Sequence, residues 1–349
     1  MQKTLKDMAK FLQNLLPPEI PETFAVGAMF LDISDEYSIR KGTLAFRDFM
    51  FQLYSRLITE DVPFDKPKKE THAFTDNTSI AASYPFICNI AVILTNIGLH
   101  GMLNESRDAI ILDNVQILTA NNNISNMKIP AVRIIECLRF LTDCGICIDG
   151  IDFSANKPDL LTHQPLVISY PENSLMLTGL KVMAIAQRDV LLRCDYRALA
   201  NKEIDIFPIF KDLINPLPAD VQAFMIKLHN DYVAQGHKCT FSTTNFYIRF
   251  TYFCRSKELW RLNISLNNGY NIGIKANNTD KYADTVEKFP KWIQEKITKG
   301  YGCGKKMGIT TSCDGGCRGF RVPLDDSFMD IGGDIETWID AEVKCVFRS

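Results

Sequence analysis

The chain has 349 residues, of which 46% are hydrophobic and 23% are charged, and its 39 Lys and Arg residues nearly balance its 41 Asp and Glu residues. A chain of this length predicts two domains, each able to bury a core of its own. The net charge of −2 argues against a strongly basic nucleic-acid-binding protein, although it leaves room for a local DNA-binding face.

The cysteines and the N-terminal segment indicate the compartment. The chain has 11 cysteines, an odd number, and several lie inside apolar patterns. Such usage is typical of a reducing cytoplasm, where a free cysteine behaves as a small hydrophobic residue. Residues 1–24 carry charges throughout and lack the long apolar run of a secretory signal. We therefore expect a cytoplasmic protein with no membrane partner.

The N-terminal part, residues 1–215, is expected to be a mostly helical domain. In chain order, helices are predicted at residues 1–16, 34–60, 84–103, 108–118 and 130–145. The last of these has Pro130 in its first turn and Gly145 at its end, and its apolar residues recur at helical spacing. Two short strands, at 146–153 and 165–171, follow it, and another helix begins near residue 172.

Three helices followed by a strand, a loop and a strand, between about residues 84 and 170, is the order of a winged-helix module. An ordinary small α+β core with the same order is the alternative. The third helix offers Arg133 and Arg139 as candidate DNA contacts, with Glu136 between them. A helix in a major groove normally presents more donors and more positive charge. A winged helix that serves as an interaction or homodimer module fits these residues equally well.

The C-terminal part, residues 216–349, is expected to be an α+β domain. A helix is predicted at 218–235, and residues 238–255 and 259–277 read as an antiparallel meander of about three strands. The turn Asn267-Asn268-Gly269 supports a tight hairpin, because Asn-Gly supplies the positive φ values that such a turn needs. Further helices are expected at 280–287, 289–299 and 334–343, with a strand at 319–324. The fold class is therefore α+β.

A cysteine-bearing loop precedes that last strand. Cys313 and Cys317 have the C-x₃-C spacing found in zinc knuckles, and Cys303 is a candidate third ligand. Zinc is therefore the candidate cofactor. A thiol–disulfide switch and a glycine-rich loop whose thiols bind nothing are the alternatives. The fourth ligand would have to come from Cys345, Cys239, His237 or Asp314.

Aromatic and arginine residues are dense in the predicted meander. Tyr247, Arg249, Trp260 and Arg261 are candidates for a pocket that takes a flat or cationic small-molecule ligand. The alternative is a core beneath a sheet that is covered on both sides.

The stretches "LWRL" after a strand, the helix "FPKWIQEKI", the cysteine loop and "GCRGFRVPLDD" carry a resemblance. On these residues, positions 218–345 resemble the C-terminal modules of uncharacterised bacterial proteins. In such proteins the loop tends to hold four or more cysteines that look like a metal site. This chain has "CGKKMGITTSC" where more cysteines would be expected. The resemblance implies a bacterial source and brings no activity.

No motif in the chain arranges a nucleophile, a base or a phosphate-binding loop. G-x-G-x-x-G, Walker A, H-E-x-x-H and G-x-S-x-G are all missing, and the 5 histidines are isolated in the sequence. This favours a binding or regulatory protein, such as a winged-helix-type transcriptional regulator with a C-terminal module that senses a ligand or metal. The alternative is an enzyme with a site between the two domains.

Overall fold

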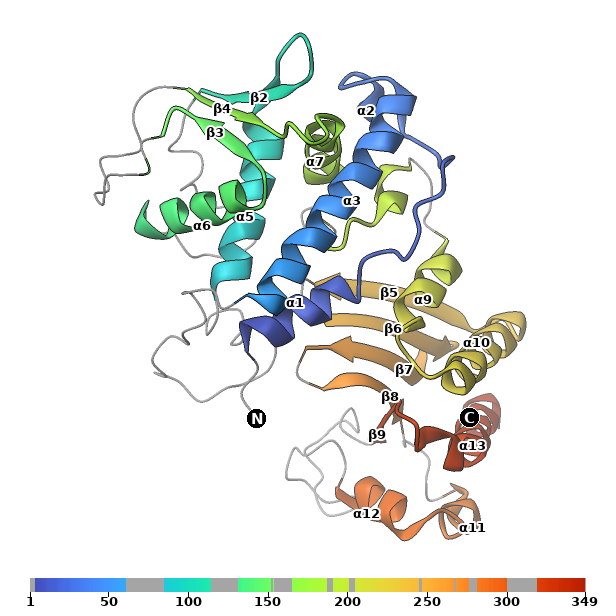
Figure 1. Ribbon diagram of the computed structural model, residues 1–349. Helices are drawn as coiled ribbons and strands as arrows, with labels where there is room; N and C mark the ends of the chain where they lie inside the picture. The colour runs from blue at the N-terminus through green and yellow to red at the C-terminus, as the bar shows by residue number, and fades with distance from the viewer. Residues whose placement is uncertain are drawn as a thin grey trace. The chain divides into compact units, whose positions relative to one another are not determined.

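The computed structural model divides the chain into two compact units, Met1–Asp205 and Ile206–Ser349. Each unit combines helices with one antiparallel sheet, so the predicted α+β class is confirmed (Figure 1). The structure describes residues 4–60, 85–113, 131–151, 153, 165–186, 191–200, 205–244, 247–266, 268–275, 281–299 and 319–348.

The helices of the first unit surround a contact between two long ones. They are α1 (Leu5–Gln13), α2 (Ala28–Leu31), α3 (Glu36–Thr59), α5 (Pro85–His100), α6 (Ala131–Asp143), α7 (Leu175–Ala186) and the short η3 (Tyr196–Leu199). Helices α3 and α7 lie side by side with their backbones in contact (Figure 1). A Cβ atom added at Gly179 would lie 1.9 Å from the carbonyl oxygen of Gly42. Only glycine at both positions permits this approach.

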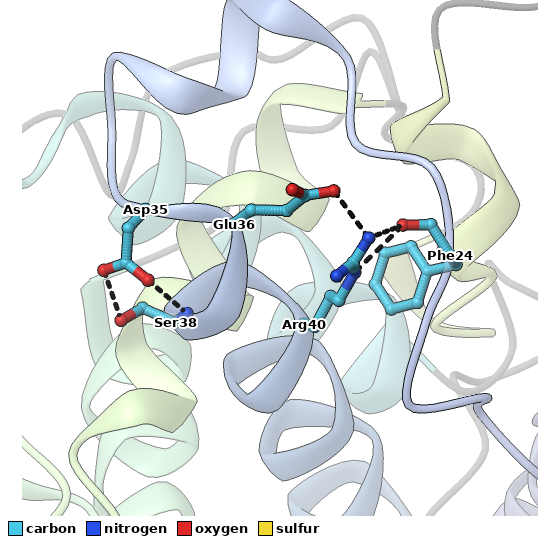
Figure 2. A network of polar contacts seen from close by, with 5 residues as sticks. All are labelled: Phe24, Asp35, Glu36, Ser38 and Arg40. Carbon is cyan, nitrogen blue, oxygen red and sulfur yellow. Dashed lines mark hydrogen bonds and ion pairs between the residues drawn. The ribbon is translucent and has the colours of Figure 1, made fainter.

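Helix α3 begins at a polar network (Figure 2). The carboxylate of Asp35 caps the helix by accepting hydrogen bonds from the Ser38 amide at 2.9 Å and the Ser38 hydroxyl at 2.6 Å. One turn later, the Arg40 guanidinium pairs with Glu36 at 2.5 Å and donates to the carbonyl oxygen of Phe24 at 2.8 and 3.0 Å. The network therefore sets the start of α3 and ties the preceding segment to it.

The sheet of the first unit has the strand order β1-β2-β4-β3, with every pair antiparallel. Its strands are β1 (Met102–Leu103), β2 (Ala109–Leu112), β3 (Cys147–Asp149) and β4 (Leu166–Ser169). The helix predicted at 108–118 is wrong for residues 109–112, which form β2. Pairing of Ile110 with Ile168 of β4 buries both side chains, and periodicity alone cannot distinguish so short an apolar run from a helix.

The second unit is a five-stranded sheet with helices. Its strands follow one another in space in chain order: β5 (Lys238–Thr244), β6 (Tyr247–Cys254), β7 (Lys257–Ser265), β8 (Gly269–Lys275) and β9 (Gly319–Pro323). The predicted hairpin joins β7 to β8, and Gly269 has a φ of 60°. The meander is thus longer than the three strands expected, because β5, β6 and β9 pair fully.

Helices pack against the second sheet and against one another. They are α9 (Ile206–Ile214), α10 (Ala219–Ala234), α11 (Ala283–Val286), α12 (Lys291–Lys299), η5 (Phe328–Asp330) and α13 (Gly332–Arg348). Helix α9 belongs to this unit, since Phe210 meets Phe250 of β6 edge-on at 5.2 Å between ring centroids. The boundary between the units thus falls earlier than the predicted one after residue 215. Trp338 of α13 is fully buried against Tyr282 and Phe289.

A search of the described helices finds none that is both long enough and apolar enough to cross a membrane.

Candidate functional site: the polar face of the second sheet

Alternate residues of the second sheet divide it into an apolar and a polar face. Side chains point to opposite sides of a strand in turn, and directly paired residues share a side. The apolar face carries Cys239, Phe241, Ile248, Phe250, Tyr252, Cys254, Trp260, Leu262, Ile264, Ile272, Ile274 and Val322. The polar face carries Lys238, Thr240, Ser242, Tyr247, Arg249, Thr251, Phe253, Glu258, Arg261, Asn263, Ser265, Asn271, Lys275 and Arg321.

The apolar face forms the core of the unit. Trp260 is fully buried and stacks on Tyr252 with 3.6 Å between ring centroids. Trp260 therefore lies on the face opposite Tyr247, Arg249 and Arg261, with which the sequence grouped it. The reason is the single-residue step from Trp260 to Arg261 within β7, which reverses the side-chain direction.

A row of hydrogen bonds crosses three strands of the polar face. The backbone register sets Arg249 of β6 opposite Asn263 of β7, and Asn263 opposite Asn271 of β8. The Tyr247 hydroxyl donates to Asn263 Oδ1 at 2.7 Å, and Asn263 Nδ2 donates to Asn271 Oδ1 at 3.0 Å. Arg249 Nε donates to the Tyr247 hydroxyl, and the Arg249 guanidinium carbon lies 4.8 Å from the centre of the Tyr247 ring. These contacts hold the Arg249 side chain in one position.

A second set of charges lies beside that row. Glu258 forms ion pairs with Arg261 at 3.4 Å and with Lys275 at 3.9 Å. A Cβ atom added at Gly273 would lie 3.2 Å from Arg261 Nε and 3.3 Å from Asn263 Nδ2. The side chains of Arg261 and Asn263 thus lie over Gly273, where any other residue would push them aside.

The polar face is positively charged. Across the described strands it carries five basic side chains and a single carboxylate, that of Glu258. The basic residues are Lys238, Arg249, Arg261, Lys275 and Arg321. An excess of positive charge on one face raises the local concentration of anions.

Burial changes across the polar face. At its centre Arg261 is 9%, Asn263 3% and Asn271 4% exposed. Arg249 and Lys275 are half-buried, and Arg321 is exposed on the edge strand β9. Buried polar groups are costly unless they are hydrogen-bonded, so the row of bonds between the strands is what allows this centre to exist.

A buried polar group that the sequence did not reveal lies on the apolar face. His229 of α10 shares a 2.6 Å hydrogen bond between its Nδ1 and the Tyr252 hydroxyl, and its ring is flanked by Phe207 and Phe210. Burial raises the pKa of the neighbouring Cys239 thiol to about 11, so this cysteine is protonated at neutral pH. The group thus contributes to packing; no spacing in the sequence joins His229 to Tyr252.

In the first unit, both candidate DNA contacts have protein partners. Arg133 pairs with Glu136 at 2.6 Å on the surface of α6. Arg139 donates to the carbonyl oxygen of Phe153, in the segment that follows β3. Arg139 therefore links α6 to that segment, while the side chain of Arg133 is 53% exposed.

Cys303, Cys313 and Cys317, the predicted metal ligands, lie outside the described residues. Within the described ranges, no group of three or more His, Cys, Asp or Glu side chains is placed to hold a metal ion. Zinc binding by the cysteine loop therefore stays a prediction.

Comparison of the chain with protein-family models, curated proteins and solved structures gives no match.

Proposed function

We propose that the chain is a regulatory protein whose first unit contains a winged-helix module. The observation that carries the proposal is the strand order of the first sheet. In a winged-helix module a helix is followed by a strand, two helices and a two-stranded wing, and the first strand pairs with the last. Here α5 precedes β2, α6 leads into β3, and β4 lies between β2 and β3.

Two stretches of the chain between β2 and β4 lie outside the described residues, namely 114–130, which precede α6, and 154–164, which follow β3. On α6, which corresponds to the recognition helix, Arg133 is the exposed cation and Glu136 neutralises it. A duplex would therefore gain about one phosphate contact from α6, that of Arg133, and most of the positive charge would have to come from elsewhere in the module.

The test is selection of duplexes from a random DNA library by the full-length protein, followed by fluorescence anisotropy with the selected sequence. Arg133→Gln is expected to weaken binding and to lower the salt slope by about 1, as for the loss of one phosphate contact. Glu136→Gln, which frees Arg133, is expected to tighten binding. Lys10→Gln, an equal change of charge at an exposed position of α1, is the control.

Failure of the selection to enrich any sequence would overturn a DNA-reading role. Equal effects of Arg133→Gln and Lys10→Gln would overturn the assignment of α6 as the helix that meets DNA. Nothing among the described residues favours the enzyme alternative, which stays a prediction.

A further inference from the structure

The sheet of the first unit has one face in the core and one face turned away from the helices. Helices α5 and α6 lie on one side of it, in contact with β2 and β3 (Figure 1). The side chains that face these helices are buried, namely Ile110, Leu112, Ile148, Leu166 and Ile168. Alternation places the remaining residues on the other side, which we call the outer face: Met102, Ala109, Ile111, Cys147, Asp149, Val167 and Ser169.

A continuous apolar row crosses the outer face. The backbone pairs Met102 of β1 with Ile111 of β2, and Ile111 with Val167 of β4. Directly paired side chains on one face lie about 4.5–5.5 Å apart, so these three form one patch. Met102 is 58% exposed and Val167 is 36% exposed, while Ile111 is half-buried. Apolar side chains exposed singly are ordinary, whereas adjoining ones are typical of a surface that meets another molecule.

The charged side chains beside the row are acidic. Asp149 of β3 is paired with Val167, so it continues the row to the edge of the sheet. Asp113 follows directly after β2, two residues beyond Ile111. Both aspartates are exposed, and neither forms an ion pair with any described residue. The row therefore has unneutralised negative charge at its margin.

The turn between β1 and β2 is acidic as well. It carries Glu105 and Asp108, both exposed. Hydrogen bonds from two neighbouring side chains lower the pKa of Asp108, so this carboxyl is ionised at neutral pH. The cation of the turn, Arg107, forms an ion pair with Asp35 at 3.7 Å. The hairpin thus adds negative charge to the surroundings of the row.

This charge decides which kind of partner fits. Carboxylates repel the phosphates of nucleic acids and of anionic lipids. A two-fold contact between two copies of the outer face would set acidic side chains against each other. A protein segment with an apolar stripe flanked by Lys or Arg matches both the row and the carboxylates.

The length of the row indicates a helix. Neighbouring strands lie about 4.8 Å apart, so the row across β1, β2 and β4 is about 10 Å long. Two residues on one face of a helix and two turns apart are separated by about 10.5 Å. A helix that crosses the strands would therefore set two apolar residues against Met102 and Val167, with its next turn at Asp149.

We propose that the outer face of the first sheet binds a basic amphipathic helix of a partner protein, with Met102, Ile111 and Val167 in the apolar contact and Asp113 and Asp149 beside its Lys or Arg residues. This role does not depend on DNA binding by the first unit.

The experiment is fluorescence anisotropy of the full-length protein with a labelled, capped helical peptide made of leucine on one face and lysine on its flanks. A matched peptide has glutamate in place of every lysine. The lysine peptide is expected to bind at one per chain and to weaken with added salt, because surface charges are screened. The glutamate peptide is expected not to bind.

Val167→Thr tests the apolar row. It replaces a methyl group by a hydroxyl group and keeps a β-branched side chain, so the strand is retained. Binding of the lysine peptide is expected to weaken by about fourfold, the value for one buried methyl group. Val233→Thr, at a position of α10 that is 44% exposed, is the matched control and should bind like the wild-type protein.

Asp149→Lys tests the charge. It should weaken binding of the lysine peptide by up to about tenfold, since one attraction becomes a repulsion, and should strengthen binding of the glutamate peptide. Asp326→Lys, an equal change of charge at an exposed turn of the second unit, is the control. All four variants are expected to keep the wild-type melting temperature within a few degrees, which separates loss of the surface from loss of the fold.

Four outcomes would overturn the proposal. The first is no binding of the lysine peptide. The second is an equal loss of affinity in a variant and its control, which would indicate diffuse attraction. The third is a DNA duplex that loses affinity in Val167→Thr, which would assign the face to nucleic acid. The fourth is a dimer in sedimentation that Val167→Thr dissociates, which would assign the face to a second copy of the chain.

Discussion

The same five strands build both faces of the second sheet, and the two faces differ in the polarity of their side chains. Trp260 and Arg261 are neighbours in the chain; one stacks on Tyr252 in the core, and the other shares Glu258 with Lys275 on the polar face. The apolar face gains stability by removing hydrocarbon from water. The polar face offsets part of that stability, because buried charges and amides are costly unless they have hydrogen-bonding partners. A sheet can carry such a face because its other side supplies the stability.

The largest expected effect is the loss of the core tryptophan. Trp260→Ala removes a fully buried indole that stacks on Tyr252, and should lower the free energy of unfolding by about 3–5 kcal/mol. Urea denaturation measures it. Trp292→Ala, at a site that is 40% exposed, is the matched control and should lower the free energy of unfolding by clearly less, because less apolar surface is buried there. Equal losses in the two variants would contradict the assignment of the apolar face as the core.

The next largest effect on the free energy of unfolding is expected at the centre of the hydrogen-bonded row on the polar face. Asn263→Ala leaves the Tyr247 hydroxyl and the Asn271 amide without their partner, at a cost of about 1–3 kcal/mol. A double-mutant cycle with Tyr247→Phe measures the coupling. A coupling energy near zero would show that the row contributes nothing to the position of Tyr247.

The buried histidine–tyrosine pair gives a smaller effect with a pH dependence. Tyr252→Phe removes the hydrogen bond to His229 and should cost about 1 kcal/mol at neutral pH. Burial raises the pKa of Tyr252 well above its ordinary value of 10.0. The stability that this tyrosine contributes below pH 10.0 is therefore lost as the pH rises from that value towards the raised pKa of the folded protein.

Unfolding in urea at pH 8 and pH 11 checks this dependence. The gap between wild-type protein and Tyr252→Phe should narrow at the higher pH, because only the wild-type protein must hold this buried phenol uncharged. Tyr37→Phe, at a site that is 67% exposed, is the control. A gap that widens with pH would contradict the assignment.

The smallest expected effect on stability belongs to Gly273. A Cβ atom there would lie within 3.4 Å of Arg261 and Asn263, so Gly273→Ala should move both side chains at a cost of less than about 1 kcal/mol. Urea denaturation measures the loss. A loss of several kcal/mol would contradict the expectation that the two side chains can move aside.

The sequence predicted most of the fold because its strongest signals are local. The helix at 34–60 and the hairpin at Asn267-Asn268-Gly269 depend on periodicity and turn chemistry, and the structure contains both. It failed at residues 109–112, where the pairing with β4 decides the conformation. That partner lies more than fifty residues later in the chain, so no local pattern could reveal it.

Only part of the candidate site was predicted, because its arrangement also depends on how distant strands pair. Strand alternation alone separates Trp260 from Arg261, and the prediction grouped them by composition instead of by face. The hydrogen-bonded row from Arg249 to Asn271 depends on the register of three strands. That register cannot be read from the sequence before the pairing of the strands is known.

The measurement that tests the division of the second sheet most directly is the free energy of unfolding in urea of the wild-type protein, Trp260→Ala and Asn263→Ala. A core face and a hydrogen-bonded polar face predict a loss of about 3–5 kcal/mol for Trp260→Ala and a smaller loss of about 1–3 kcal/mol for Asn263→Ala. Equal losses in the two variants, or no loss in either, would contradict that division.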